Sequence, residues 1–535
     1  MKKDSLFKTA GLIALITILS KVFGFLRDVM IAKHYGATVV SDAYFYAYQL
    51  PSLALIIMGG LGGPFHTATV AIFSKLASSE DDASFEYAQK VFNTFLTITG
   101  VIFAIFSVAI FFFAHDIISI VAAGATPKLQ QLATMQLKIM SPVVFIGGII
   151  GIFYGISNVY REFMMTSFSP TVASLATIAG LMLLSSSDSS GIILSWTTLI
   201  GAVGQLAIQF PAFLKTRYKY KPTLDIKDNN VSRLIEILFP AMIATTIGQM
   251  NIYIDMFFAS NLQEGAWSAI GYSNRLFQFP VGIIMTAMLV PLFPMFSEFV
   301  GKKDYSSLKK YYHQGVNSLW FLCFPILGFI FLFSQNLISL VFERGSFDHN
   351  ATVMVSQALM FLSLSMIPYV ARDTLTRVYY AFDDSKTPFL VAMISIVVKT
   401  MMNILLISVL GLGIPGITLS TTTVTWVNFI LLASFMKKKI DLNFWELIQP
   451  TIKLIIATAA MMGAGFASKV LLGHYFDTTN TLKLAGIGVH FLICAIVYFG
   501  VCTMLKVHAM TVCVTRLKNK FFKTKTPEDI VLISE

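Results

Sequence analysis

The fold of this chain is decided by apolar stretches such as KVFNTFLTITGVIFAIFSVAIFFFA, residues 90–114, which has no charged side chain after Lys90. A helix of about 20 such residues crosses the hydrocarbon core of a bilayer. Comparable stretches recur along the sequence, so we predict an all-α polytopic membrane protein with about fourteen transmembrane helices. The predicted spans cover residues 8–33, 43–73, 90–114, 133–158, 168–185, 191–214, 233–259, 267–297, 314–334, 351–381, 388–410, 415–436, 451–472 and 483–506.

The composition excludes an ordinary soluble protein. Of the 535 residues, 56% are hydrophobic and 13% are charged, which is about half the charged fraction of a soluble domain. A formal net charge of +11 would suggest a nucleic-acid partner in a soluble protein. Here the basic residues gather between the spans, so we expect no nucleic acid. The four cysteines form no CxxC pair, and we predict no metal or other cofactor.

The connections between the spans alternate in charge. The basic set comprises Lys2 and Lys3, 75–90, 215–233, 302–310, 437–439 and the segment from Lys506 to Lys525. The connections 185–191, 260–268 and 410–416 are nearly free of Lys and Arg. The positive-inside rule then predicts that both termini are cytoplasmic. Because every connection is short, we expect no extramembrane catalytic domain and do not predict an enzyme.

An internal duplication is indicated by three pairs of similar segments in the same order. Asp28 and Asp255 end two comparable spans, YAYQLP resembles NRLFQFP, and NVYREFMMTSFSP resembles RVYYAFDDSKTP. A repeat of six spans predicts two pseudo-symmetric six-helix lobes in the same orientation, plus two C-terminal helices. The predicted parts are an N-lobe at 1–220, a C-lobe at 221–440, two further spans at 441–510, and a basic cytoplasmic tail at 511–535 that either lies on the inner leaflet or is disordered.

Ionisable side chains inside spans are the candidate functional residues, since each costs several kcal/mol unless it is paired or hydrated. The first span carries Lys21, Arg27 and Asp28. Residues seven apart share a helix face, so Asp28 is placed to satisfy Lys21 while Arg27 lines a cavity. The alternative is a local ion pair that only orients the helix. Together with Arg275, these cations favour an anionic substrate such as a diphosphate, because Arg donates forked hydrogen bonds to phosphate oxygens.

Further polar residues interrupt later spans. Lys399 lies deep in the eleventh span, four residues before Asn403. It either pairs with Asp255 across a lobe interface or snorkels toward the membrane surface. The tenth predicted span carries two arginines and an aspartate, at 372, 377 and 373. In the second span, GGLGGP at 59–64 either bends the helix or allows close packing.

At these residues the chain resembles the MurJ/MviN family of lipid II flippases, in the multidrug/oligosaccharidyl-lipid/polysaccharide (MOP) exporter superfamily. The motifs that carry the resemblance are SKVFGFLRDVMIAKHYGATVVSDAYFYAYQLP (20–51), YSNRLFQFPVGIIMTAMLVPLFPMFSE (272–298), VFERGSFD (341–348) and RVYYAFDDSKTP (377–388). IPYVARDTLTRVYYAF (367–382) and GGPFH (62–66) look most like the cyanobacterial and chlamydial branch.

The resemblance implies a function in peptidoglycan synthesis. It implies transport of lipid II, an undecaprenyl-diphosphate disaccharide-pentapeptide, from the cytoplasmic to the periplasmic leaflet of the inner membrane by alternating access. It further implies a monomeric transporter that works near cell-wall synthesis proteins. The family's cavity cations fall on Lys21, where Arg is usual, and on Arg27 and Arg275. Its acidic residue at the start of the second span falls on Asp42.

Two departures from the family pattern stand out. Many relatives carry two arginines shortly after the LP of the second span, where this chain reads SLALIIMGG. The resemblance implies a sodium ion between the seventh and eleventh spans in some relatives. Asp255 matches the carboxylate of that site, but Lys399 occupies a neutral ligand's position. We hypothesise that the lysine ammonium replaces the ion and makes this member independent of sodium.

Three other functions are compatible with parts of the pattern. A transporter of another polyprenol-linked glycan, such as an O-antigen unit, would share the fold and the cationic cavity. A membrane glycosyltransferase would need a catalytic carboxylate on a substantial outward loop, and the outward loops here are short. A drug or cation antiporter of the same superfamily would need a more acidic cavity than these residues predict.

Overall fold

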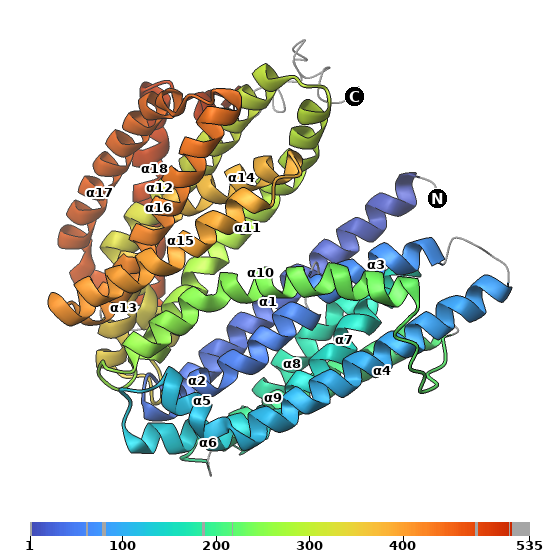
Figure 1. Ribbon diagram of the computed structural model, residues 1–535. Helices are drawn as coiled ribbons and strands as arrows, with labels where there is room; N and C mark the ends of the chain where they lie inside the picture. Colours follow the sequence, from blue (N-terminus) through green and yellow to red (C-terminus); the bar gives the residue numbers. More distant parts are fainter. Residues whose placement is uncertain are drawn as a thin grey trace. The chain divides into compact units, whose positions relative to one another are not determined.

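The computed structural model describes residues 3–59, 63–76, 82–184, 188–216, 218–476, 480–512 and 514–515. Within those ranges all regular structure is helical, which confirms the predicted all-α class (Figure 1). The helices that carry most of the chain are α1 Lys3–Tyr35, α2 Val39–Ala54, α3 Pro64–Leu76, α4 Asp82–Phe112, α5 Ala114–Val121, α6 Pro127–Met140, α7 Pro142–Val159, α8 Phe163–Leu184, α9 Ile192–Leu214, α10 Asn229–Ala259, α11 Ala266–Gly301, α12 Tyr305–Phe342, α13 His349–Ser363, α14 Met366–Ala381, α15 Lys386–Asn403, α16 Gly413–Ile440, α17 Ile448–Phe476 and α18 Asn480–Met504.

Each predicted span falls on one or more of these helices. In the described part of the chain, ten helices are long and apolar enough to cross a membrane, or up to twelve if each of two bent pairs is one span. The predicted count of about fourteen is therefore not confirmed. The difference concerns the first two predicted spans, on α1 and on α2 with α3, which are not among those ten to twelve.

Two predicted spans are interrupted helices. In the second span, α2 passes into a π-helical turn, Leu55–Gly59, and α3 begins at Pro64. This is the position of the GGLGGP motif, whose residues 60–62 lie outside the described ranges. The tenth predicted span is the pair α13 and α14, which meet at an angle of 48°. The sequence signal for an irregular second span therefore coincides with a real change of helix type.

The chain forms two compact units. Unit 1 is Met1–Tyr272 with Phe342–Ala351, and unit 2 is Ser273–Val341 with Thr352–Glu535. The division into six-helix lobes at 1–220 and 221–440 stays a prediction. Arg161 and Asp383, in the segments that suggested a duplication, both have a left-handed φ after a helix end. Lys303 and Lys506 end α11 and α18 in the same way, so this shared turn does not by itself test the duplication.

Unit 1 is built around the close packing of α1, α8 and α9 (Figure 1). Small residues allow the approach: a Cβ added at Gly201 of α9 would lie 2.9 Å from the Ala173 Cα of α8. Helices gain tight contact in a membrane through such small residues. The segment after α9 is fastened to α4, where Lys90 pairs with Asp225 at 2.7 Å. In unit 1, α1 therefore packs on α8, and α8 packs on α9.

Unit 2 contains a helix, α12, with two backbone irregularities. Pro325 has no N–H, so the Phe321 carbonyl loses its helical donor. Tyr498 of α18 donates its hydroxyl to this carbonyl at 2.8 Å. Further along, Phe333 departs from helical geometry, and Lys469 of α17 donates to the neighbouring Leu332 carbonyl at 3.2 Å.

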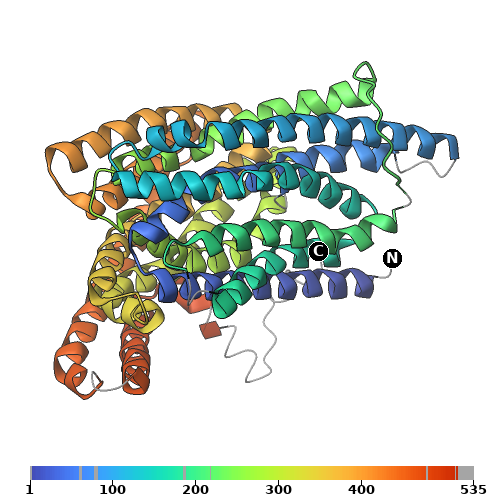
Figure 2. The same ribbon diagram turned by 90° about the horizontal axis from the view of Figure 1, so that it is seen from below.

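The C-terminal pair α17 and α18 therefore stabilises the two irregular positions of α12 by hydrogen bonds to its backbone carbonyls. The two helices run side by side, the red pair in Figure 2. Together they supply one hydrogen-bond donor to a backbone carbonyl at each irregularity of α12. In a soluble protein, water would supply these donors. Backbone carbonyls within a bilayer need such partners, because the hydrocarbon offers none.

We expect Tyr498→Phe to lower the stability of the folded protein. The substitution keeps the ring, which is fully buried, but leaves the Phe321 carbonyl without its donor, a loss of about 1–3 kcal/mol. Thermal unfolding of the full chain in lipid nanodiscs would measure it as a lower midpoint. Tyr305→Phe, at a partly exposed tyrosine of the same unit, is the control. Equal unfolding midpoints for the two variants would show that the Tyr498 hydroxyl does not stabilise α12.

Candidate functional site

Unit 1 contains a cavity of about 270 Å³ lined by side chains of α1, α2, the π turn, α8 and α9. Three α1 residues line it, Ser20, Gly24 and Arg27, at the four- and three-residue spacing that places side chains on one helix face. Ser174 and Thr177 of α8 follow the same spacing. The cavity is therefore an opening between helix faces, and α1 presents its charged residue to it.

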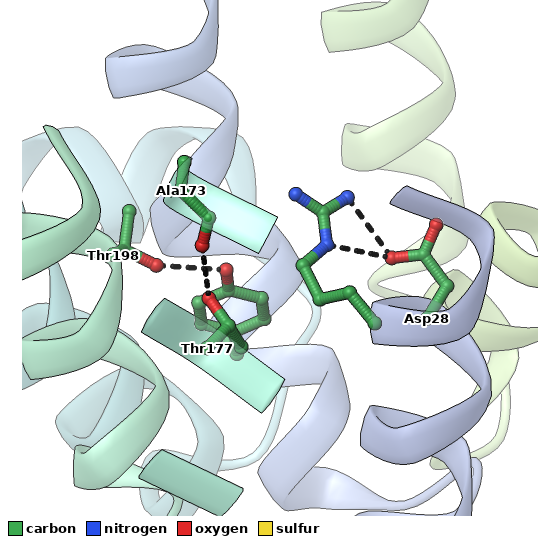
Figure 3. Close-up of polar contacts among 6 residues, drawn as sticks. Asp28, Ala173, Thr177 and Thr198 are labelled. Atoms are coloured by element: carbon green, nitrogen blue, oxygen red, sulfur yellow. Dashed lines mark hydrogen bonds and ion pairs between the residues drawn. The ribbon is translucent and has the colours of Figure 1, made fainter. Parts of the chain in front are cut away.

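Arg27 is the charged residue of the cavity wall. Its Nε and Nη2 both donate to one oxygen of Asp28, at 3.1 and 3.0 Å (Figure 3). The Arg27 side chain is 21% exposed and that of Asp28 is 6% exposed. Two of the five N–H donors of the guanidinium are used in this pair. The ion pair thus lowers the cost of the charge, and the other donors are available to a ligand in the cavity.

The opposite part of the cavity wall carries hydroxyl groups. Tyr44 of α2 and Thr198 of α9 share a hydrogen bond of 2.9 Å. Thr177 of α8 donates to the Ala173 carbonyl at 3.2 Å (Figure 3). Tyr48 stacks on Tyr44 with 5.6 Å between the ring centroids. A guanidinium facing hydroxyls and aromatic rings is suited to a polar anion such as a phosphate.

The remaining predicted residues of unit 1 lie outside this cavity. Lys21 is exposed and is not among the lining residues, and its pairing with Asp28 stays a prediction. Asp42 is 3% exposed. One of its oxygens accepts from the Gly265 N–H and the other from the Ser268 N–H, both at 2.7 Å. The Asp42 carboxylate therefore ties α2 to the beginning of α11.

The loop between α1 and α2 is closely packed against the loop after α12 and against Tyr272 of α11. Gly36 has φ +60, and a Cβ there would lie 2.3 Å from the Ser346 carbonyl oxygen. The Ser346 N–H donates to the Lys33 carbonyl at 2.8 Å. The Tyr272 hydroxyl donates to the Gly36 carbonyl at 3.1 Å. These contacts hold the end of α1, and so the position of its cavity face.

The other predicted residues are divided between the units. Asp255 is a partly buried residue of α10, in unit 1. Arg275 is a partly buried residue of α11, in unit 2. Lys399 and Asn403 lie on the buried face of α15, in unit 2, at 1% and 0% exposure. The Lys399 ammonium donates to Thr421 Oγ1 at 2.6 Å and to the Ile417 carbonyl at 3.5 Å.

Sequence reasoning found the cation of the cavity but missed most of its wall. Tyr44, Tyr48, Thr198 and Gln205 were not predicted as site residues, although all line it. Their signal is a set of hydroxyl and amide side chains inside apolar spans, four apart at Tyr44 and Tyr48 and seven apart at Thr198 and Gln205. That signal is weak because Ser and Thr commonly bond to their own helix, as Thr198 also does to Leu194.

Solved structures with the same fold are membrane transporters. The chain is similar to a structure described as lipid II flippase MurJ in an inward closed conformation, with a TM-score of 0.77 and 22% identity over 92% of this chain and 98% of that one. It is also similar to an inward-facing multidrug resistance MATE family transporter of the MOP superfamily, with a TM-score of 0.60 and 13% identity over 81% of this chain and 98% of that one. The fold is that of the polytopic helical transporters of this superfamily.

Sequence comparison assigns the family. The model of the family described as lipid II flippase MurJ matches residues 31–485. A probable lipid II flippase MurJ of Synechocystis is 29% identical over 87% of this chain and 88% of its own length. The lipid II flippase MurJ of Burkholderia cenocepacia is 26% identical over 81% of this chain and 84% of its own length. The chain belongs to the lipid II flippase MurJ family, which confirms the resemblance seen in the motifs.

We expect Arg27 and Asp28 to act in opposite directions on anion binding. Arg27→Ala removes charge-assisted hydrogen bonds worth about 1.5–3 kcal/mol, so a diphosphate lipid should bind roughly tenfold more weakly or worse. Asp28→Asn removes a competing carboxylate and should tighten binding. The measurement is the affinity of each variant for undecaprenyl diphosphate in nanodiscs, determined by native mass spectrometry. It should be lower than that of the wild type for Arg27→Ala and higher for Asp28→Asn.

The charge-preserving Arg27→Lys is the matched control for the first substitution. It should recover part of the affinity, because the ammonium keeps the charge and loses the planar fork. Equal binding by the wild type and both Arg27 variants would mean that the cavity does not hold the diphosphate.

Proposed function

We propose that this chain carries lipid II from the cytoplasmic to the periplasmic leaflet of the bacterial inner membrane by alternating access. The observation that carries the proposal is the Arg27 guanidinium in the wall of a cavity inside a membrane-type helical unit. A cation is retained at such a position only at substantial cost, so it indicates an anionic substrate. The names of the related proteins, lipid II flippases, supply the particular anion.

In this mechanism the diphosphate is the part of the substrate that the protein holds. Arg27 donates to phosphate oxygens, and the hydroxyls of Tyr44 and Thr198 complete the polar surroundings. The prenyl tail stays in lipid, since transfer of so long a chain through a polar cavity would cost far more than it gains. We propose Lys21 and Arg275 as further cations for the diphosphate and Asp42 as the residue that fixes α2.

The orientation of the chain follows from its basic connections. We propose that both termini are cytoplasmic, with α17 and α18 as the last two spans and the basic tail on the cytoplasmic side. Lipid II would then enter from the side that carries the basic loops. The transporter acts without a cofactor and close to the enzymes of cell-wall synthesis.

A glycosyltransferase is a poorer fit to the acidic residues outside the spans. Asp188 accepts from the Ser190 and Ile193 N–H groups and from the Tyr35 hydroxyl. Burial opposes ionisation of this carboxyl, but these hydrogen bonds outweigh it, so that the pKa of Asp188 lies below its usual value. Asp348 likewise accepts from the Ala351 N–H at the start of α13. Both carboxylates accept from backbone N–H groups at the start of a helix, and the lowered pKa of Asp188 is the opposite of what a general acid needs.

Complementation of a flippase-depleted strain tests the proposed function. Wild type should restore growth and prevent accumulation of lipid II, whereas Arg27→Ala and Arg275→Ala should fail although both are present in the membrane. Lys310→Ala, at an exposed position outside the proposed site, is the matched control and should complement. Loss of O-antigen units with normal lipid II levels would instead identify a transporter of another polyprenol-linked glycan.

We further propose that this member works without sodium, with the Lys399 ammonium taking the place of the ion that the family resemblance implies. A buried ammonium bonded to a hydroxyl and a carbonyl oxygen uses the ligand types that sodium takes. The pairing of Lys399 with Asp255 and the part played by Asn403 stay predictions. Transport by the wild type should not change when sodium is replaced by potassium.

The variant Lys399→Asn should depend on sodium, since it removes the internal cation and restores a neutral ligand. The measurement is lipid II translocation in vesicles with sodium or potassium on both sides. If Lys399→Asn were active and indifferent to sodium, the ammonium would have no such role.

A further inference from the structure

The chain between α9 and α10 is held along the side of α4. Residues 218–228, called here the linker, contain no helix or strand and lie wholly in unit 1. The Gln89 side chain donates to the Lys219 carbonyl at 3.0 Å, and the Asn93 side chain accepts from the Lys221 N–H at 3.2 Å. These two α4 residues are four apart and therefore share a face of the helix. The backbone of the linker is thus held at two points, while both lysine side chains are exposed.

Two tyrosines complete the attachment of the linker. Tyr218 is buried, with its ring centroid 5.0 Å from that of Phe92 in α4. The hydroxyls of Tyr220 and Thr97 are 3.1 Å apart. Tyr220 is the donor, because the Thr97 hydroxyl already donates to the Asn93 carbonyl at 2.7 Å. Thr97 lies one turn beyond Asn93 on the same face of α4, so the linker follows this helix for about two turns.

The attachment lies at the edge of the apolar part of α4. Residues 91–112 contain no charged side chain, and this stretch is about 32 Å long at 1.5 Å per residue. The hydrocarbon core of a bilayer is roughly 30 Å thick. Lys90, which precedes the stretch, is therefore expected at the level of the lipid headgroups. Tyrosines are enriched at this level, which fits the position of Tyr220 beside the first turns of the apolar stretch.

The acidic groups of the linker are engaged, whereas two of its cations are not. Asp225 pairs with Lys90 at 2.7 Å, and Asp228 accepts from the first N–H groups of α10. In the part of the chain that the structure describes, no carboxylate pairs with Lys219 or Lys221. The linker therefore presents two neighbouring ammonium groups at the level of the headgroups.

The linker also exposes large apolar side chains next to these cations. Leu224 is 64% exposed, Ile226 is 56% exposed and Tyr220 is 50% exposed. Apolar side chains that stand beside lysines are typical of segments that lie in a membrane interface. There the lysines contact anionic headgroups, and the apolar side chains enter the boundary with the acyl chains.

We propose that the linker binds an anionic phospholipid in the leaflet on the side of the basic connections, with Lys219 and Lys221 contacting its phosphate. Lysine ammonium groups bind phosphate as point charges. Leu224 and Ile226 then contact the acyl chains below the headgroup, which a soluble acidic partner would leave exposed to water. This site binds a lipid of the surrounding membrane and not a transported one, so it does not depend on the proposed function.

The affinity of the full chain for phosphatidylglycerol tests this site. The protein in phosphatidylcholine nanodiscs is titrated with phosphatidylglycerol, and bound lipid is counted by native mass spectrometry. The double variant Lys219→Gln/Lys221→Gln should bind it roughly tenfold more weakly, because two charged contacts are lost. The matched control is Lys437→Gln/Lys438→Gln, which removes two neighbouring exposed lysines at the end of α16. The control should stay within twofold of the wild type.

Two further measurements locate the lipid and test the geometry of the linker. Hydrogen exchange of peptides from residues 218–228 should slow when phosphatidylglycerol is added, whereas peptides from 437–443 should not change. Asn93→Ala keeps every charge but releases the Lys221 N–H, so it should weaken the binding several-fold. Tyr220→Phe, which loses only the bond to Thr97, is the milder variant and should have a smaller effect. Thermal unfolding in phosphatidylcholine alone shows that each variant is folded.

Three results would overturn the proposal. Equal weakening by the two lysine pairs would mean a general attraction between a basic protein and anionic lipid. Unchanged affinity of Lys219→Gln/Lys221→Gln would place the lipid elsewhere. Displacement of phosphatidylglycerol by millimolar inorganic phosphate would make the linker a site for free phosphate. None of these results bears on lipid II transport, which the complementation experiment tests separately.

Discussion

The cost of burying a charge among apolar helices is the constraint on which the site depends. A guanidinium at the level of Arg27 is tolerated because Asp28 takes two of its N–H groups and because the cavity gives the others a polar space. Neither condition is sufficient alone. Without Asp28, the positive charge of Arg27 would face only the hydroxyl groups of the cavity. Without the cavity, no ligand could reach the guanidinium in its ion pair. The α1 helix is held at both its packed face and its loop end, which keeps the guanidinium directed at the cavity.

The same environment governs the backbone. Water cannot repair a broken helix inside a bilayer, so each break in the chain needs a donor from elsewhere in the protein. The Phe321 carbonyl, which Pro325 leaves without a helical donor, accepts from the Tyr498 hydroxyl. Near the break between α13 and α14, the Thr422 hydroxyl donates to the Phe361 carbonyl at 2.9 Å. Irregular helices are therefore stabilised by side chains that sequence periodicity assigns to ordinary packing.

The sequence predicted the helices well because hydropathy reports directly on a bilayer, and it predicted Arg27 because ionisable residues within spans are rare. Helix geometry alone did not indicate the pairing of Asp28 with Arg27, and its pairing with Lys21 stays a prediction. Ideal helical geometry places Lys21 on the same face, but the long, flexible stem of Arg27 lets its guanidinium reach the carboxylate of the very next residue. Asp42 shows the same limit: its buried partners, Gly265 and Ser268, are more than two hundred residues away, and no local pattern indicates such a contact.

A transporter must release what it binds, and the charge pattern is consistent with that requirement. Unpaired arginines would hold a diphosphate tightly and slow its departure, since most changes in affinity appear in the dissociation rate. Arg27 has the Asp28 carboxylate beside it. Under the proposed function, the Arg27 guanidinium would return to Asp28 when the substrate leaves, so the empty site would still pair the charge. The Asp28 carboxylate would thereby lower the barrier to release at the expense of some affinity.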